Sequence, residues 1–123
     1  MTYQEVISEV RDVYNNTFQE TTYKKWLDEL EAEISVYKGE EPKEINIEDE
    51  VRLQLPFSKM YTYFLLMKVA LHQHDDESYA RYSSVYFTQL TEWQKHYIRT
   101  TPGKKRVYKN WMEEENYEKV SPI

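Results

Sequence analysis

The sequence predicts an all-α domain of four helices, and three observations lead to this expectation. Residues 57–71 are apolar on almost every side, as is typical of a helix at the centre of a core. Residues 77–100 carry aromatic side chains at alternating three- and four-residue steps, which places them on one face of a second long helix. Two earlier segments, residues 6–14 and 23–37, show apolar stripes of the same helical period.

The first helix is expected to begin at a capping box and to end at a pair of asparagines. Thr2 and Glu5 have the spacing at which each side chain caps the backbone amide of the other residue. Asn15 and Asn16 favour caps and turns over helix interiors. The apolar face between these signals holds Val6, Ile7, Val10, Val13 and Tyr14.

The second helix is expected to start around Thr22 and to stop at Gly39. Glycine adopts the left-handed conformation that ends many helices, and Pro42 follows shortly afterwards. One face of this helix presents an apolar stripe made of Tyr23, Trp26, Leu27, Leu30, Ile34 and Tyr37. We assign the other face to the acidic residues Asp28, Glu29, Glu31 and Glu33.

Residues 39–50 are expected to form an extended acidic loop with few apolar groups. Residues 45–47 and 51–55 alternate apolar and polar side chains, so each segment should pair as a short strand or lie extended over the helices. The loop has little apolar surface to offset the entropy lost on ordering. We therefore expect it to order only when copies assemble, with Ile45 and Ile47 packing against a neighbour.

The third and fourth helices are expected to be joined by a short acidic turn at residues 74–76. Pro56 should occupy the first position of the third helix, where a missing amide hydrogen costs nothing. The fourth helix should end at the stop signal of residues 100–103. Its aromatic stripe consists of Tyr79, Tyr82, Tyr86, Leu90, Trp93 and Tyr97. From these faces we expect a core that includes Trp26, Leu30, Phe64, Leu65, Leu71, Phe87 and Leu90.

The chain changes character after the fourth helix, so we divide it into a helical domain, residues 1–101, and a C-terminal docking arm, residues 102–123. The arm joins a basic cluster to side chains that often anchor protein interfaces: Lys104, Lys105, Arg106, Tyr108, Trp111 and Met112. Basic and aromatic residues together could also contact nucleic acid through phosphates and stacking. Three acids at residues 113–115 weaken that alternative, so we predict that the arm docks on protein.

The charge of the chain is negative overall and unevenly divided. The formal net charge is −6, with −8 in residues 1–58 and +2 in residues 59–123. This balance argues against a general DNA-binding surface. Two electrically different ends favour head-to-side association between copies, although a charged surface also serves simply to keep a helical protein in solution.

Residues that could support catalysis or metal binding are sparse. The chain has no cysteine, no Gly-x-Ser-x-Gly motif and only two glycines, which excludes thiol chemistry and a phosphate-cradling loop. His72 and His74 precede two aspartates, but side chains two residues apart on a helix point away from each other. We expect no catalytic residue, no cofactor and no metal. The longest uncharged run, residues 60–67, is too short to span a membrane, and residues 1–13 lack the pattern of a signal peptide.

Three stretches of the chain, taken together in their order, point to a family. Residues 24–31 contain Trp-Leu-Asp-Glu-Leu-Glu, residues 55–61 are Leu-Pro-Phe-Ser-Lys-Met-Tyr, and residues 79–102 are rich in tyrosine and end in Arg-Thr-Thr-Pro. This series resembles the small helical head–tail connector proteins of tailed bacteriophages, also called adaptor or head-completion proteins. The turn at residues 72–76 departs from the Asn-Gly or Asp-Gly type that is more usual in the family.

The resemblance implies a structural role in the virion. Proteins of this family form a homo-oligomeric ring beneath the portal protein, usually of twelve copies, which extends the DNA channel and presents a platform to the next tail or stopper protein. We therefore expect a subunit of the head–tail interface that is assembled in the host cytoplasm and lets DNA pass without specific binding. The alternative is a small helical regulatory module that binds a partner protein as a monomer or dimer. A metal-dependent enzyme using His72 and His74 is a third hypothesis.

Overall fold

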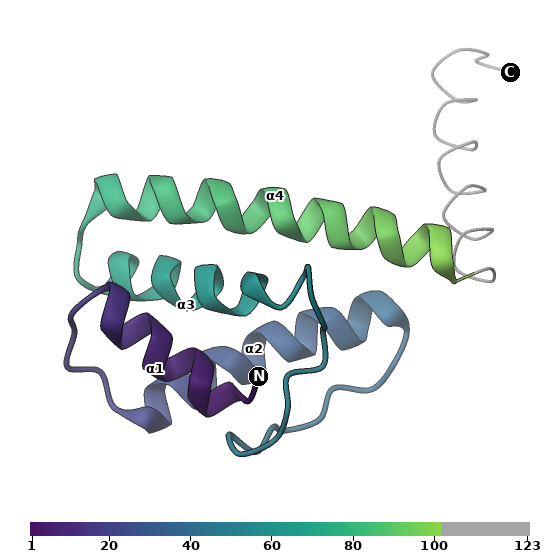
Figure 1. Ribbon diagram of the computed structural model, residues 1–123, viewed down its shortest axis with the longest axis horizontal. Coiled ribbons are helices and arrows are strands. Elements are labelled where there is room, and N and C mark those ends of the chain that lie inside the picture. Colours follow the sequence, from purple (N-terminus) through teal and green to yellow (C-terminus); the bar gives the residue numbers. More distant parts are fainter. Residues whose placement is uncertain (102–123) are drawn as a thin grey trace, which may run out of the picture. The chain divides into compact units, whose positions relative to one another are not determined.

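The computed structural model describes residues 1–101, which form four helices (Figure 1). These are α1 (Tyr3–Val13), α2 (Glu20–Lys38), α3 (Lys59–His72) and α4 (Asp76–Thr100). Within these residues there is no strand, and the only β-type pairing is an isolated bridge between Thr2 and Glu50. The predicted all-α class with four helices is confirmed. The predicted docking arm, residues 102–123, lies outside the described residues.

Helix α1 begins at the capping box that the sequence predicts. The Thr2 hydroxyl accepts a hydrogen bond from the Glu5 amide, and the Glu5 carboxylate accepts one from the Thr2 amide, each over 3.2 Å. Val13 was expected on the apolar face but is 58% exposed, because it is the last residue of the helix. The buried face consists of Tyr3, Val6, Ile7 and Val10.

Helix α2 ends at Gly39, as predicted. Gly39 has a φ of 75°, in the left-handed region, and its amide donates to the carbonyl groups of Ser35 and Val36. Glycine reaches this conformation without the steric cost of a β-carbon, so it satisfies carbonyl groups that the helix end leaves unpaired. The start of the helix lies at Glu20, slightly before the predicted Thr22.

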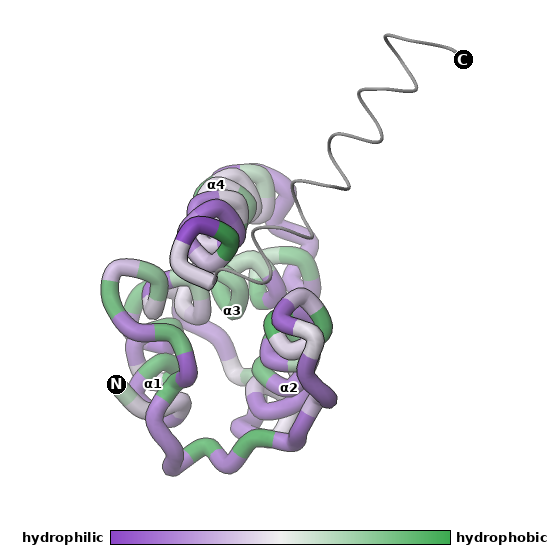
Figure 2. Tube along the Cα trace, turned by 90° about the vertical axis from the view of Figure 1, so that its right-hand side faces the viewer, coloured by the Kyte–Doolittle hydropathy of each residue, from purple (hydrophilic) through white to green (hydrophobic). Residues whose placement is uncertain are grey.

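Helix α3 is the central helix of the first ninety residues. Nine of its fourteen residues are buried, and it packs against both α1 and α2. Figure 2 shows hydrophobic colouring along much of α3. An all-round apolar sequence therefore corresponds to a helix that is enclosed on several sides.

Pro56 does not occupy the first position of α3, so that prediction was wrong. The helix begins at Lys59, and residues 55–58 form a turn before it, in which the Leu55–Pro56 peptide bond is cis. The Phe57 amide donates to the Gln54 carbonyl over 2.9 Å. A proline with fixed φ fits such a turn as well as a helix start, and the sequence does not separate the two.

The described residues divide into two compact units, one of residues 1–90 and one that begins at Thr91. In the first unit, the opening turns of α4 pack on α3 and on the end of α1. Aromatic pairs make this packing, with ring centroids 5.2 Å apart for Phe64 and Tyr86, 6.4 Å for Tyr63 and Tyr82, and 6.2 Å for Tyr14 and Tyr82. Such separations are typical of favourable aromatic contacts.

The described part of the second unit is the end of α4. Trp93 is buried, and its ring stacks on Tyr97 at a centroid distance of 5.7 Å. All six residues of the predicted stripe on α4 are buried or half-buried. Within the first unit, Tyr82 and Tyr86 of the stripe face α3 and the end of α1.

Four of the seven predicted core residues are buried: Trp26, Leu30, Phe64 and Leu65. Leu90 is half-buried. The prediction was wrong for Leu71 and Phe87, which are 46% and 53% exposed. Phe87 follows the buried Tyr86 by one residue, which turns it about 100° away from the inward face. Leu71 lies in the last turn of α3, directly before three exposed residues.

Candidate functional site

The acidic loop lies against helices of its own subunit. We call residues 40–50 the strap. The Ile45 amide donates to the Asp28 carboxylate over 2.8 Å, and Lys24 pairs with Glu44 over 2.7 Å. Both partners belong to α2. Side chains of α2 thus provide partners that the loop's own composition does not reveal. The expectation that the loop gains order only in an assembly stays a prediction.

The strap also caps the start of α1. The amides of Gln4 and Tyr3 donate to the carbonyl groups of Ile47 and Asp49 over 2.9 and 3.1 Å. The first amides of a helix have no partner within that helix. The strap supplies those partners through its backbone, so it is part of the structure that holds α1 in place.

One carboxylate near the strap is completely buried. Glu31 of α2 is 1% exposed, and it accepts hydrogen bonds from the hydroxyl groups of Tyr3 and Tyr61, the latter over 3.2 Å. The Tyr61 hydroxyl in turn accepts one from the Leu53 amide over 3.2 Å. This network joins α1, α2 and α3 to the segment that follows the strap.

Burial changes the pKa values of the three side chains in this network, Glu31, Tyr3 and Tyr61. It raises the pKa of Glu31, because desolvation penalises the charged form, while the Tyr3 hydrogen bond, the charge of Arg52 and the Tyr61 hydrogen bond act in the opposite direction. Burial also raises the pKa of the Tyr3 and Tyr61 hydroxyl groups, and the nearby Glu31 adds to the effect. Both tyrosines therefore remain protonated hydrogen-bond donors.

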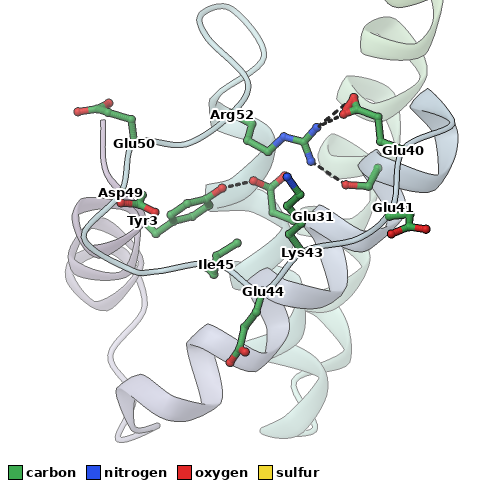
Figure 3. Close-up of a pocket in the computed structure, with 11 residues that line it drawn as sticks. Tyr3, Glu31, Glu40, Glu41, Lys43, Glu44, Ile45, Asp49, Glu50 and Arg52 are labelled. Carbon is green, nitrogen blue, oxygen red and sulfur yellow. Dashed lines mark hydrogen bonds and ion pairs between the residues drawn. The ribbon is translucent and has the colours of Figure 1, made fainter.

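Arg52 fastens the segment after the strap to the end of α2. Its guanidinium donates to the hydroxyl of the buried Ser35 over 2.7 Å and pairs with Glu40 over 3.1 Å. Figure 3 shows the Arg52 side chain extending toward Glu40. The contact connects the two ends of the strap, since Glu40 begins it and Arg52 lies just beyond it.

These groups line a hollow of about 630 Å³ that carries a strong negative charge. Only Lys43 and Arg52 contribute cationic side chains to its lining. Glu31 is already engaged by two hydroxyl groups, so it serves to hold helices together and is poorly placed to transfer protons to a ligand. The carboxylates of the lining belong to Glu31, Glu40, Glu41, Glu44, Asp49 and Glu50.

The two histidines near the α3–α4 turn, His72 and His74, lie in environments that differ from each other. The His72 ring stacks on Trp26 with centroids 5.2 Å apart and lies 6.2 Å from the Phe18 ring. His74 adopts a φ of 58° in the turn itself. Among residues 1–101, no group of three or more His, Cys, Asp or Glu side chains is placed to hold a metal ion. Within the same residues, no helix is long and apolar enough to cross a bilayer.

Two of the eight predicted interface residues belong to the part of the chain that the structure describes. Ile45 and Ile47 are half-buried in the strap. The assignment of Glu31 to the charged face of α2 was wrong, because it follows the buried Leu27 by four residues and so lies on the same side. That spacing was the signal that could have revealed it. The other six predicted interface residues lie outside the described residues: Lys104, Lys105, Arg106, Tyr108, Trp111 and Met112.

Comparison of the chain with protein-family models, with curated proteins and with solved structures found no match.

Proposed function

We propose that this chain is a structural subunit of a phage virion at the head–tail junction. Twelve copies form a ring below the portal protein, continue its DNA channel and offer a platform to the next tail or stopper protein. The subunit binds protein partners and catalyses no reaction.

The observation that carries this proposal is the place of the three family-like stretches in the fold. Residues 24–31 lie on α2, residues 55–61 lead into α3, and residues 79–100 run along α4. Each stretch contributes a buried aromatic residue: Trp26, Tyr61 and Tyr86. A likeness that falls on separate core helices in the same order supports a shared architecture more than a match on one helix does.

The distribution of charge supports contacts between copies. Carboxylates line the hollow beside the strap, whereas Lys104, Lys105 and Arg106 form a basic cluster near the C-terminus. Opposite charges on two ends of one chain favour a heterologous contact of the kind that closes a ring. The acidic surface also suits a channel through which DNA moves without being held.

The test is to measure the mass and shape of this chain alone and mixed with a portal protein from the same genome. Light scattering and negative-stain electron microscopy should find one ring of twelve copies on each portal ring. A chain that stays monomeric or dimeric and leaves the portal bare at every mixing ratio would contradict the proposal. That outcome would favour the regulatory protein-binding module instead.

A further inference from the structure

We infer that the strap is a latch that opens as one unit while the helical core stays folded, and that its opening uncaps α1. In the ring, and so resting on the proposed function, an open strap would present the carbonyl groups of Ile47 and Asp49 and the side chain of Ile45 to a neighbouring copy. The opening itself is a property of the single chain.

The outer part of the strap is held by weak contacts. The ion pair between Lys24 and Glu44 is 2.7 Å long, but the Glu44 side chain is 79% exposed. Exposed ion pairs add little stability and are screened by salt. Ile45 and Ile47 are only half-buried, so little apolar area holds this part in place.

Each end of the strap is anchored to the rest of the subunit. At one end, the Glu40 amide donates to the Ser35 carbonyl over 2.8 Å. Beyond the other end, Val51 and Leu53 are 3% and 8% exposed, and the Leu53 amide is bonded to the Tyr61 hydroxyl. The segment that can move therefore lies between two anchors, which is the arrangement of a latch.

Opening of the strap must also change the start of α1. The amides of Tyr3 and Gln4 donate only outside their own helix, to the carbonyl groups of Asp49 and Ile47. When the strap lifts, these two amides become accessible to water together with the Ile45 amide, which donates to Asp28. Three amides on two elements should thus report one event.

The experiment is amide hydrogen exchange followed by NMR on the full chain, at low salt and at about 0.5 M salt. The amides of Tyr3, Gln4 and Ile45 should share one protection factor, which is lower than those of Leu53 and Leu65. Higher salt should lower the shared value and leave Leu65 nearly unchanged. An exchange of all three amides that requires global unfolding would overturn the inference.

Two variants sharpen the test. Lys24→Met removes the ion pairs of Lys24 with Glu44 and with Asp28. It should speed the exchange of Tyr3, Gln4 and Ile45 together, by about twofold to fivefold, the range for exposed pairs. Lys25→Met, at an exposed neighbouring lysine, is the matched control and should change none of them. Faster exchange at Ile45 alone, with Tyr3 and Gln4 unaffected, would show that the strap does not open as a unit.

The outcomes separate this inference from the proposed ring. A strap that opens in a chain that never joins a portal would defeat the ring and leave the latch. A ring that forms from chains whose strap stays closed until global unfolding would defeat the latch and leave the ring.

Discussion

At the residue scale, Glu31 combines favourable hydrogen bonds with an unfavourable burial of charge. It is 1% exposed and is bonded to Tyr3 and Tyr61. Because burial raises its pKa, the folded protein holds a proton on Glu31 more tightly than the unfolded chain does. The stability linked to this proton is fully present below the unfolded pKa and is lost as the pH rises through the folded pKa.

Glu31→Gln should therefore change how stability depends on pH. As the pH rises from the ordinary carboxyl value of 4.5 toward neutrality, the free energy of unfolding of the wild-type protein should fall relative to that of the variant. Urea unfolding at several pH values in this range measures the difference. Glu41→Gln, at an exposed acid of the same hollow, is the matched control. A difference between wild type and Glu31→Gln that stays constant with pH would contradict a raised pKa at Glu31.

Two leucines test the placement of the core at single positions. Leu30 is 0% exposed and Leu71 is 46% exposed. Leu30→Ala should lower the free energy of unfolding by about 2–5 kcal/mol, the usual cost of a cavity in a core. Leu71→Ala removes the same atoms from a partly solvated site and should cost less than about 1 kcal/mol. Denaturant unfolding of both variants checks this, and equal losses would mean that the two faces are wrongly placed.

At the scale of elements, α3 and α4 differ in how much of their surface is enclosed. α3 is buried on several sides, whereas the part of α4 in the first unit buries Tyr86 and half-buries Tyr79, Tyr82 and Leu90. Tyr86 shows why tyrosine suits such positions: its ring packs on Phe64, and its hydroxyl donates to Glu33 over 3.4 Å. Tyrosine therefore covers apolar surface and still finds a polar partner at the edge of the core.

The end of α2 gives a prediction at the same scale. Gly39 has a φ of 75°, so Gly39→Ala should lower the free energy of unfolding by about 1–2 kcal/mol through a clash of the new β-carbon. Gly39→Asn should cost less, because asparagine tolerates the left-handed region. Thermal or denaturant unfolding of the two variants provides the measurement. An alanine variant as stable as the wild type would show that the left-handed cap is absent in solution.

At the scale of the whole molecule, charge and the C-terminal residues govern assembly in the proposed function. Residues 1–58 carry a charge of −8, and Lys104, Lys105 and Arg106 carry the opposite sign. Aromatic residues such as Trp111 often provide most of the binding energy of an interface. The arm should therefore contribute to contacts between subunits more than to folding of the single chain.

Deletion of residues 104–123 should leave the midpoint of thermal unfolding of the single chain nearly unchanged and should reduce incorporation into portal complexes. Each buried aromatic side chain can add about 1.5–3 kcal/mol, so Trp111→Ala alone should already weaken incorporation. Replacing the exposed Lys95 by Ala is the control, since it lies on α4 outside the arm. Normal incorporation of the deleted chain, or a deleted chain that fails to fold, would each contradict the docking role.

Local signals were enough to predict most of the helical framework. The capping box of Thr2 and Glu5, the stop at Gly39 and the aromatic stripe of α4 all depend on residues close together in the chain. Their physical causes, which are hydrogen bonds at helix ends and the helical period, act over a few residues. For this reason the four helices could be derived from the sequence alone.

The position of the strap and the burial of Glu31 depend on residues that are distant in the chain, so only the tertiary structure decided them. The strap lies against the helices because Asp28, Tyr3 and Gln4 bond to it. Glu31 is enclosed because Tyr3 and Tyr61 approach it from two other helices. These partners cannot be predicted from the composition of residues 40–50 or from the apolar pattern of α2. Burial and hydrogen bonding of a side chain are set by all the elements around it, so they follow only once the helices are packed.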